Sequence, residues 1–141
     1  MADGKLETGG KDGKEYVFTY ELEEQYDRIN DTHKICFKTL LEGIDKKNWF
    51  DFKVAPVGEK TLKVTDMFDY QDTYKGKGLP EALILEAQKQ YLDKEITSSS
   101  NKQKVFKNEW RSEAGTTVWE RLVKKGLAEY SDEKDLFVLK K

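Results

Sequence analysis

The sequence has very few metal-binding and redox-active side chains: Cys36 is the only cysteine and His33 the only histidine among 141 residues. A single cysteine cannot form a disulfide within the chain, and neither a cysteine-based zinc site nor a site with several histidine ligands can be built. We therefore expect no metal cofactor. A chain without disulfides is compatible with a reducing compartment, so we expect a cytoplasmic protein in which Cys36 is a small, buried apolar side chain.

Long apolar stretches and a strong charge imbalance are also missing. No run approaches the ~20 apolar residues that span a membrane, and the first 15 residues contain no apolar segment of the kind found in signal peptides. Charged residues make up 37% of the chain, but the net charge is only −2, so the molecule as a whole has no electrostatic footprint for nucleic acid. These features argue against a membrane or a nucleic acid as partner and leave the oligomeric state open.

The residues that are present are sufficient for one folded domain. Aromatic side chains make up 12% of the chain, and a chain of this length can bury a substantial core. Residues 1–14 combine glycine with charge and are predicted to be a disordered N-terminal lead. The domain is therefore expected to cover residues 15–141.

The hydrophobic pattern predicts strands and helices in a mixed order. Residues 15–22 alternate as in a strand, whereas apolar residues within 29–44 recur at helical spacing, with Asn30 or Asp31 as the cap. The further elements expected are a strand hairpin at about 49–70, a helix at 79–93, a short strand from 95, a helix at about 108–125 and a closing hairpin at 127–139. This order predicts an α/β (α+β) domain whose mixed central sheet is flanked by helices.

A glycine-rich, basic segment precedes the helix expected at 79–93. It lies within YKGKGLPEALIL, residues 74–85, and we call residues 74–80 the glycine knot. Gly76 and Gly78 permit positive φ angles and the close approach of another group, and N–H groups at a helix start bind phosphate oxygens. Lys75 and Lys77 add full charges. The knot is therefore a candidate phosphate site, although a plain strand-to-helix turn can also contain Gly-x-Gly.

The knot resembles the acetyl-CoA loop of the GCN5-related N-acetyltransferases, whose pattern is Arg/Gln-x-x-Gly-x-Gly/Ala. The later stretch ITSSSN…EWRSEAGTTVWERLVKKGLAEYSDEKDLFVL is similar to the last strand, helix and hairpin of that family. The resemblance covers about residues 49–141. It implies a single-domain, acyl-CoA N-acyltransferase-like fold, acetyl-CoA as co-substrate, and transfer of the acetyl group to a primary amine of a small molecule or a protein.

The resemblance also implies where the cofactor lies. Backbone N–H groups of the knot would hold the pyrophosphate, and pantetheine would pair with the end of the preceding strand. Ser100 and Asn101 end the next predicted strand beside this cleft, where they could bind pantetheine or simply form a polar loop. The expected cofactor-binding residues are Phe68, Tyr70, Lys75, Gly76, Lys77, Gly78, Leu79, Pro80, Ser100 and Asn101.

Two positions of the knot depart from the family pattern. Lys75 stands at the Arg/Gln position, where it keeps a charge but lacks a planar guanidinium. Pro80 stands at the last Gly/Ala position and removes one N–H from the cradle.

The catalytic groups are not identified by the sequence. Transfer to an amine needs a base for the ammonium, and Asp66 is a candidate because it lies on the apolar side of the strand before the knot; alternatively it is an aspartate paired at a strand edge or bulge. The family often has a tyrosine acid in its last helix, but Trp119 and Leu122 occupy the nearest positions here. Tyr130, just past that helix, is the candidate substitute.

Two other functions remain open. Residues 102–125 contain seven basic and three acidic residues, so residues 79–139 could form a winged-helix nucleic-acid-binding unit; the acids near the tip of its wing, at 132–135, argue against it. The chain could also be a non-catalytic binding protein that keeps the acetyltransferase fold.

Overall fold

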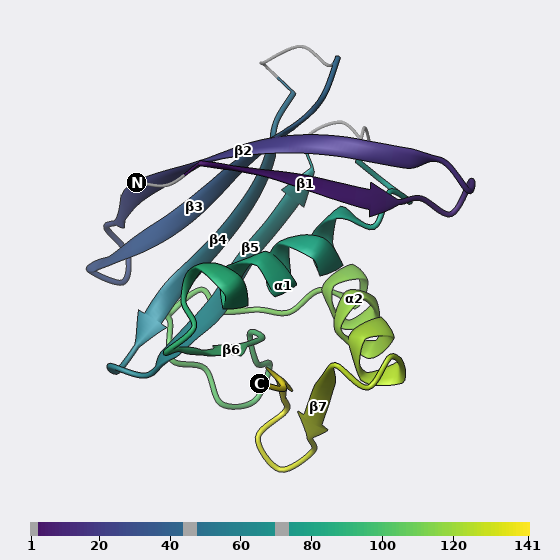
Figure 1. Ribbon diagram of the computed structural model, residues 1–141. Helices are drawn as coiled ribbons and strands as arrows, with labels where there is room; N and C mark the ends of the chain where they lie inside the picture. Colours follow the sequence, from purple (N-terminus) through teal and green to yellow (C-terminus); the bar gives the residue numbers. More distant parts are fainter. Residues whose placement is uncertain (1–2, 44–47, 70–73) are drawn as a thin grey trace.

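Eight strands and two helices make up the part of the chain that the computed structural model describes, namely residues 3–43, 48–69 and 74–141 (Figure 1). The strands are β1 (Gly4–Gly9), β2 (Glu15–Asp27), β3 (Thr32–Leu41), β4 (Phe50–Val57), β5 (Thr61–Asp69), β6 (Glu95–Thr97), β7 (Ala128–Ser131) and β8 (Leu136–Leu139). The helices are α1 (Leu79–Gln90) and α2 (Glu113–Lys124). The mixed α and β class expected from the sequence is confirmed.

The strands form one mixed sheet in the order β1-β2-β3-β4-β5-β6-β8-β7. All neighbours are antiparallel except β5 and β6. These two are parallel because α1 connects them as a crossover, which a parallel pair requires. The sheet curls, so that β1 lies beside α1 although the two are far apart in the sequence (Figure 1).

The prediction of a disordered N-terminal lead is wrong for the described residues of that segment. Gly4–Gly9 forms β1 and pairs with β2 along its whole length. Leu6 is the physical reason, because its side chain is buried in the core against the face of β2 that carries Phe18 and Tyr20. A single buried leucine among glycines and charges is too weak a pattern to predict a strand.

The helix predicted over residues 29–44 is also wrong, because Thr32–Leu41 forms strand β3. Cys36 and Phe37 are adjacent and both have no exposed area, so β3 is buried on both faces. A strand buried on both faces lacks the alternation that distinguishes it from a helix. Cys36 is buried as expected, and burial, followed by the nearby Asp51 carboxylate, raises the pKa of its thiol to about 12.

The residues expected to cap that helix instead form the turn between β2 and β3. The Asp27 carboxylate accepts the N–H of Ile29 at 3.0 Å, and Asp31 has a φ of 47°. Aspartate and asparagine favour turns for the same reason that they favour helix caps, namely short side chains that bond to nearby backbone.

The remaining predicted elements form in the predicted order. The hairpin β4–β5, helix α1, strand β6, helix α2 and the hairpin β7–β8 all lie close to the expected ranges. Helix α2 begins later than expected, because the Ser112 hydroxyl accepts the Gly115 N–H at 3.0 Å and caps it. Trp110, expected within this helix, therefore precedes it and is 66% exposed.

Residues 79–139, all of which the structure describes, lack the middle helix that the winged-helix alternative requires. They contain α1 and α2, but the segment between β6 and α2 is irregular and supplies no third helix. The hairpin β7–β8 continues the main sheet through the pairing of β8 with β6.

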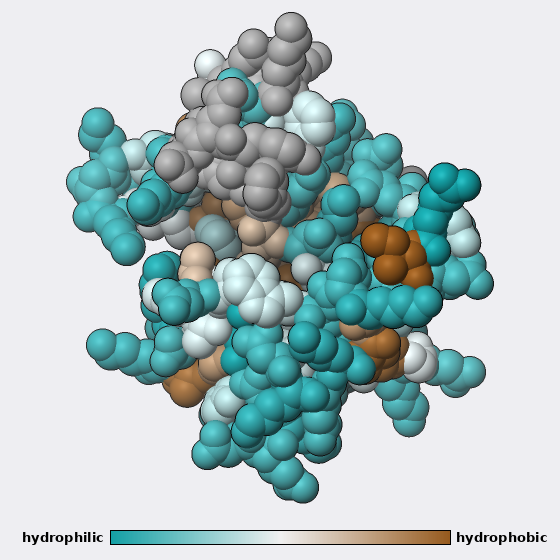
Figure 2. All heavy atoms as spheres, turned by 180° about the vertical axis from the view of Figure 1, so that it is seen from behind, coloured by the Kyte–Doolittle hydropathy of each residue, from teal (hydrophilic) through white to brown (hydrophobic). Residues whose placement is uncertain are grey.

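One cluster of buried side chains joins the sheet to both helices. Trp119 of α2 stacks on Phe137 of β8, and the aromatic rings of Phe37 and Phe52 meet edge to face. The face seen in Figure 2 is mostly hydrophilic, with apolar side chains in small separate groups. Neither described helix is long and apolar enough to cross a membrane.

Candidate functional site: the cavity beside the glycine knot

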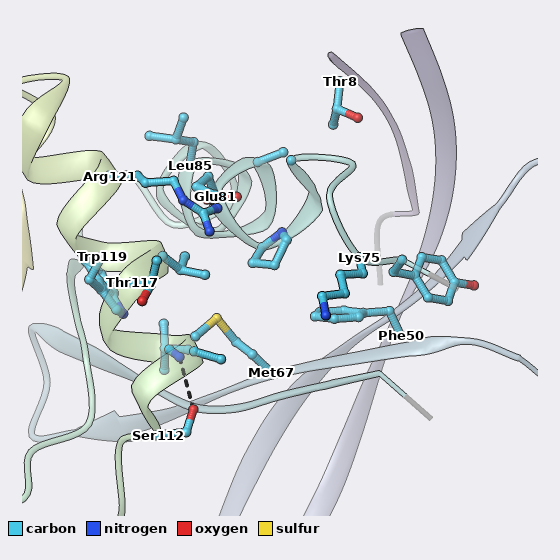
Figure 3. Close-up of a pocket in the computed structure, with 18 of the residues that line it drawn as sticks. Thr8, Phe50, Met67, Lys75, Glu81, Leu85, Ser112, Thr117, Trp119 and Arg121 are labelled. Atoms are coloured by element: carbon cyan, nitrogen blue, oxygen red, sulfur yellow. Dashed lines mark hydrogen bonds and ion pairs between the residues drawn. The ribbon is translucent and has the colours of Figure 1, made fainter. Parts of the chain in front are cut away.

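A cavity of about 790 Å³ lies where β1, β5, the knot and both helices meet (Figure 3). This volume lies in the range of ligand-binding clefts, about 300–1,000 Å³. Met67 of β5, Leu85 of α1 and Trp119 of α2 contribute apolar walls, while Lys75 extends from the knot beside the ring of Phe50 (Figure 3). The cavity therefore combines apolar walls with charged lining residues.

Strand β5 presents an open edge to this cavity. Its pairing with β6 covers only the three positions from Thr61 to Lys63, whereas β5 continues to Asp69. Beyond Lys63, no described strand pairs with this edge. The register between β4 and β5 also shifts here, because Val54 faces Val64 but Lys53 faces Asp66, which leaves Thr65 as the extra residue of a β-bulge.

The glycine knot leads directly into α1 and requires its glycines. Gly76 and Gly78 have φ angles of 71° and 73°, in the left-handed region that favours glycine. Gly78 is the N-cap of α1 and has no side chain to satisfy the first N–H groups of the helix. A Cβ atom at Gly78 would lie 3.0 Å from the carbonyl oxygen of Gly9, so the close approach of β1 also excludes a side chain there.

The knot is held by the N-terminal hairpin. The Thr8 hydroxyl donates to the Lys77 carbonyl at 2.6 Å, and the Lys11 N–H donates to the Gly76 carbonyl at 2.9 Å. In a trans peptide the C=O and N–H point in opposite directions, and the described chain contains no cis peptide. The N–H groups of Lys77 and Gly78 therefore point away from the hairpin.

The knot residues predicted to bind phosphate do not all face the cavity. Lys75, Gly76, Gly78 and Pro80 line it, whereas Leu79 is fully buried in the core. The Lys77 ammonium lies over the Tyr16 ring, 5.2 Å from its centroid. Of the two lysines, only Lys75 thus contributes its charge to the cavity wall.

Positive charge exceeds negative charge in the cavity lining. Five cationic residues line it, namely Lys11, Lys75, Arg111, Arg121 and Lys125, against the three acids Glu7, Asp66 and Glu81. Arg121 of α2 reaches across to Glu81 of α1, with which it forms an ion pair (Figure 3). One oxygen of Glu81, Oε2, is buried without a hydrogen-bond partner among the described residues. An anionic ligand with some hydrogen-bond donors suits this lining.

Asp66 lies at the bulge, between the cavity and a second, smaller pocket. Its Oδ1 atom accepts the Thr65 hydroxyl at 2.6 Å and pairs with the Lys34 ammonium at 3.2 Å. The smaller pocket has a volume of about 170 Å³ and shares Asp66 and Trp110 with the main cavity. The sequence left two alternatives for Asp66: a paired aspartate at a bulge, or a group in the functional site. In the structure Asp66 is paired at the bulge and also lines the candidate cavity.

Ser100 and Asn101 belong to the linking loop (residues 98–112), where their polar groups bond to the chain itself. The Ser100 hydroxyl donates to the Lys134 carbonyl at 3.0 Å and accepts two backbone N–H groups of the loop. The Asn101 side-chain amide group donates to the Arg111 carbonyl, and its oxygen accepts the Arg111 N–H. Neither residue lines the cavity; Ser99 does.

Two buried carboxylates hold the linking loop. Glu109 pairs with Lys63 at 2.7 Å, and their side chains are 0% and 5% exposed; it also accepts the N–H groups of three loop residues. Burial alone raises the pKa of Glu109, but the Lys63 bond and these N–H groups outweigh it and lower the pKa.

Asp135 is the second buried carboxylate. It pairs with Arg111 at 2.6 Å and accepts the Asn101 N–H at 2.8 Å. Burial raises the pKa of Asp135, yet the bonds from Arg111, Tyr130 and Asn101 prevail and bring the pKa to about 2. This pair fixes Arg111 in the cavity wall.

Tyr130 lies outside the cavity lining, although it was the candidate acid. Its hydroxyl donates to Asp135 at 2.7 Å, and this hydrogen bond, followed by burial, raises the pKa of Tyr130. Trp119, one of the two residues expected nearest the tyrosine position of the resembled family, lines the cavity but has no acidic proton. Tyr70 lies outside the described residues, and Phe68 belongs to β5.

Several residues of the site escape sequence reasoning. Thr8 and Lys11 lie in a segment that resembles a disordered lead, and Arg121 lies on a helix face that resembles ordinary solvated surface. Glu109 had a detectable signal, because an acid surrounded by three lysines and an arginine within residues 102–111 is a candidate for burial with a cation. Its partner, Lys63, is 46 positions away and could not be identified.

The described residues contain no group of three or more histidine, cysteine, aspartate or glutamate side chains arranged to hold a metal ion. No model of a known protein family matches the chain, and no curated protein matches it either.

Proposed function

We propose that the protein is an acetyl-CoA-dependent N-acetyltransferase with an acyl-CoA N-acyltransferase-like fold. The observation that carries this proposal is the open edge of β5, which runs along the cavity from the bulge at Thr65 towards the glycine knot. An extended ligand arm with amide groups can pair with such an edge as an added strand does. A pyrophosphate at the end of that arm would then lie against the start of α1.

The cationic lining supports the same orientation of the cofactor. Lys75 would contact the pyrophosphate together with the knot's N–H groups, and Arg121 offers the planar guanidinium that the knot lacks at Lys75. The pantetheine arm would extend past Met67 towards the bulge. The thioester would then lie near Thr65 and Asp66, beside the smaller pocket that would admit the amine.

The reaction is direct transfer. The amine nitrogen attacks the thioester carbonyl, the new C–N bond forms, the C–S bond breaks, and the amine loses one proton. If the amine arrives as an ammonium, it must first lose a further proton to free its lone pair, and Asp66, the carboxylate proposed at the reaction centre, would accept that proton and pass it to water. The cavity wall of α2 offers Trp119 instead of an acid, so the leaving thiolate would take its proton from water.

Calorimetric titration with acetyl-CoA tests the proposal. We expect a dissociation constant in the micromolar range, about 1 μM–1 mM. Thr117 is exposed on α2 and lines the cavity, so Thr117→Trp should fill the cavity and weaken binding at least about tenfold. Val123→Trp places the same ring on the same helix outside the cavity lining and should leave binding unchanged. Absence of wild-type binding at millimolar acetyl-CoA would overturn the proposal.

Release of free CoA thiol in the presence of primary amines separates transfer from binding. We expect release that depends on the amine and weakens in Asp66→Asn. Tight binding without any amine-dependent release would instead identify a non-catalytic acetyl-CoA-binding protein.

A further inference from the structure

The N-terminal hairpin, residues 4–20, contributes to the cavity wall. Glu7, Thr8, Gly9 and Lys11 all line the cavity, although β1 is the strand farthest from β5 to β8 in the sheet order. The curl of the sheet brings β1 against α1 (Figure 1), and Figure 3 shows Thr8 on the strand that passes the knot.

The hairpin contacts the knot through the knot's carbonyl groups. The Thr8 hydroxyl and the Lys11 N–H donate to the carbonyls of Lys77 and Gly76, and the Gly9 carbonyl oxygen lies only 3.0 Å from where a Cβ of Gly78 would be. These contacts fix the planes of two successive peptide groups. Without them, glycine residues with many accessible backbone conformations would be free to rotate these planes.

We propose that this hairpin forms part of the binding site for a phosphate-bearing ligand. Thr8 and Lys11 both position the knot, and Lys11 also contributes charge. Thr8 is a positioning residue, because its hydroxyl turns the Gly78 N–H away from the hairpin. Lys11 acts through its backbone in the same way, and its side chain adds a second cation from this side of the cavity lining for the ligand's phosphate groups. The inference rests on the proposed function in that acetyl-CoA is the expected ligand.

The cavity charges favour a ligand with several phosphate groups. Lys11, Lys75 and Lys125 come from three separate segments of the chain. They contribute positive charge to one lining in a molecule whose net charge is −2. A single carboxylate would need fewer cations, whereas several phosphate groups carry enough negative charge to match this lining.

The test compares three ligands on the full chain: acetyl-CoA, inorganic pyrophosphate and acetyl-pantetheine, which lacks phosphate. Thr8→Val keeps the shape of the side chain and removes the hydroxyl. It should weaken the binding of acetyl-CoA and of pyrophosphate roughly 3- to 10-fold, as expected for the loss of one hydrogen bond. The affinity for acetyl-pantetheine should not change. Thr8→Ser should restore wild-type affinity. Thr19→Val, an exposed threonine on the same hairpin, is the matched control.

Lys11→Ala should lower the affinity for both phosphate ligands and also make that affinity less dependent on salt concentration. Lys5→Ala removes an exposed lysine of β1 outside the cavity lining and should change neither. Thermal unfolding of each variant identifies any loss of folded protein.

The outcomes distinguish this inference from the proposed function. Equal affinity in wild type and Thr8→Val, or an equal loss for acetyl-pantetheine, overturns the inference and leaves acetyl-CoA binding intact. A wild type that binds pyrophosphate but not acetyl-CoA overturns the acetyltransferase proposal, while weaker pyrophosphate binding by Thr8→Val would still support the hairpin's role. A wild type that binds neither phosphate ligand overturns both.

Discussion

Two loops that line the same cavity are stabilised in opposite ways. In the linking loop, carboxylate, hydroxyl and amide oxygens accept backbone N–H groups: Glu109 accepts three, Ser100 two, and Asp135 and Asn101 one each. In the glycine knot, the N-terminal hairpin binds two carbonyl groups instead. The linking loop therefore uses its donors internally, whereas the knot keeps its amide donors turned away from its support.

This difference shows which loop can serve a ligand. A phosphate needs N–H donors, and seven backbone N–H groups of the linking loop already bond to side-chain oxygens. The polar side chains of Ser100 and Asn101 then serve the loop itself. The knot has the reverse arrangement, so we expect loss of polar side chains in the linking loop to affect mainly stability, and loss of the hairpin side chains that support the knot to affect mainly binding.

The largest expected effect on stability comes from Glu109→Ala in the linking loop. The change leaves the buried Lys63 ammonium and three backbone N–H groups without their acceptor, which should cost about 3–5 kcal/mol in the free energy of unfolding. Urea unfolding at pH 7 measures it. Glu120→Ala, an exposed acid on α2, should change stability by less than about 0.5 kcal/mol. A loss below about 1 kcal/mol for Glu109→Ala would mean that the loop is not held by this pair.

Asp135→Asn should have the next largest effect, and its size should depend on pH. The folded-state pKa of Asp135 is about 2, against an ordinary value of 3.8, so its ionised form stabilises the fold above about pH 4. That contribution, about 2 kcal/mol, is lost as the pH falls from 4 towards 2. Urea unfolding at several pH values should therefore show wild type and Asp135→Asn converging at acid pH. The exposed Asp132→Asn is the control, and a difference that is constant with pH would contradict the prediction.

The knot itself allows a matched comparison between two glycines. Both have positive φ angles, and alanine should cost each about 1 kcal/mol for that reason. Gly76→Ala meets no atom within 4 Å, whereas the new Cβ at Gly78 meets the Gly9 carbonyl at 3.0 Å. Gly78→Ala should therefore destabilise the protein by about 1 kcal/mol more than Gly76→Ala in urea unfolding. Equal losses of stability in the two variants would mean that the Gly9 carbonyl does not restrict the side chain at position 78.

The two loops also differ in how far the sequence predicts them. The knot could be identified from local residues, because glycines, lysines and a proline before an apolar helix are all within seven positions. Its support could not, because Thr8 and Lys11 are more than 60 positions away in a segment of glycines and charges. The linking loop was predicted as polar, but its order depends on Lys63 and Asp135, which only the folded sheet brings to it.

The same limit explains the wrong helix at residues 29–44. Local spacing was compatible with a helix, and only the pairing of β3 with β2 and β4 determines the outcome. The order of the elements from β4 onward was predictable because several of them are bounded by turn or cap residues in the sequence, such as Gly58 and Gly78. Where both faces of a strand are buried, tertiary contacts override local pattern.

The smallest expected effect is that of Tyr130→Phe, which tests whether a residue of the stabilising network also serves catalysis. The hydroxyl donates to Asp135 outside the cavity lining, so its loss should lower stability only slightly and change amine-dependent CoA release by less than about twofold. Tyr26→Phe is the matched control, because its exposed ring makes the same kind of bond to Asp31 at 2.6 Å. A tenfold fall in kcat/KM for Tyr130→Phe alone would show that the hydroxyl reaches the reacting thiolate. The proposed division between a stabilising loop and a ligand-binding knot would then fail at this residue.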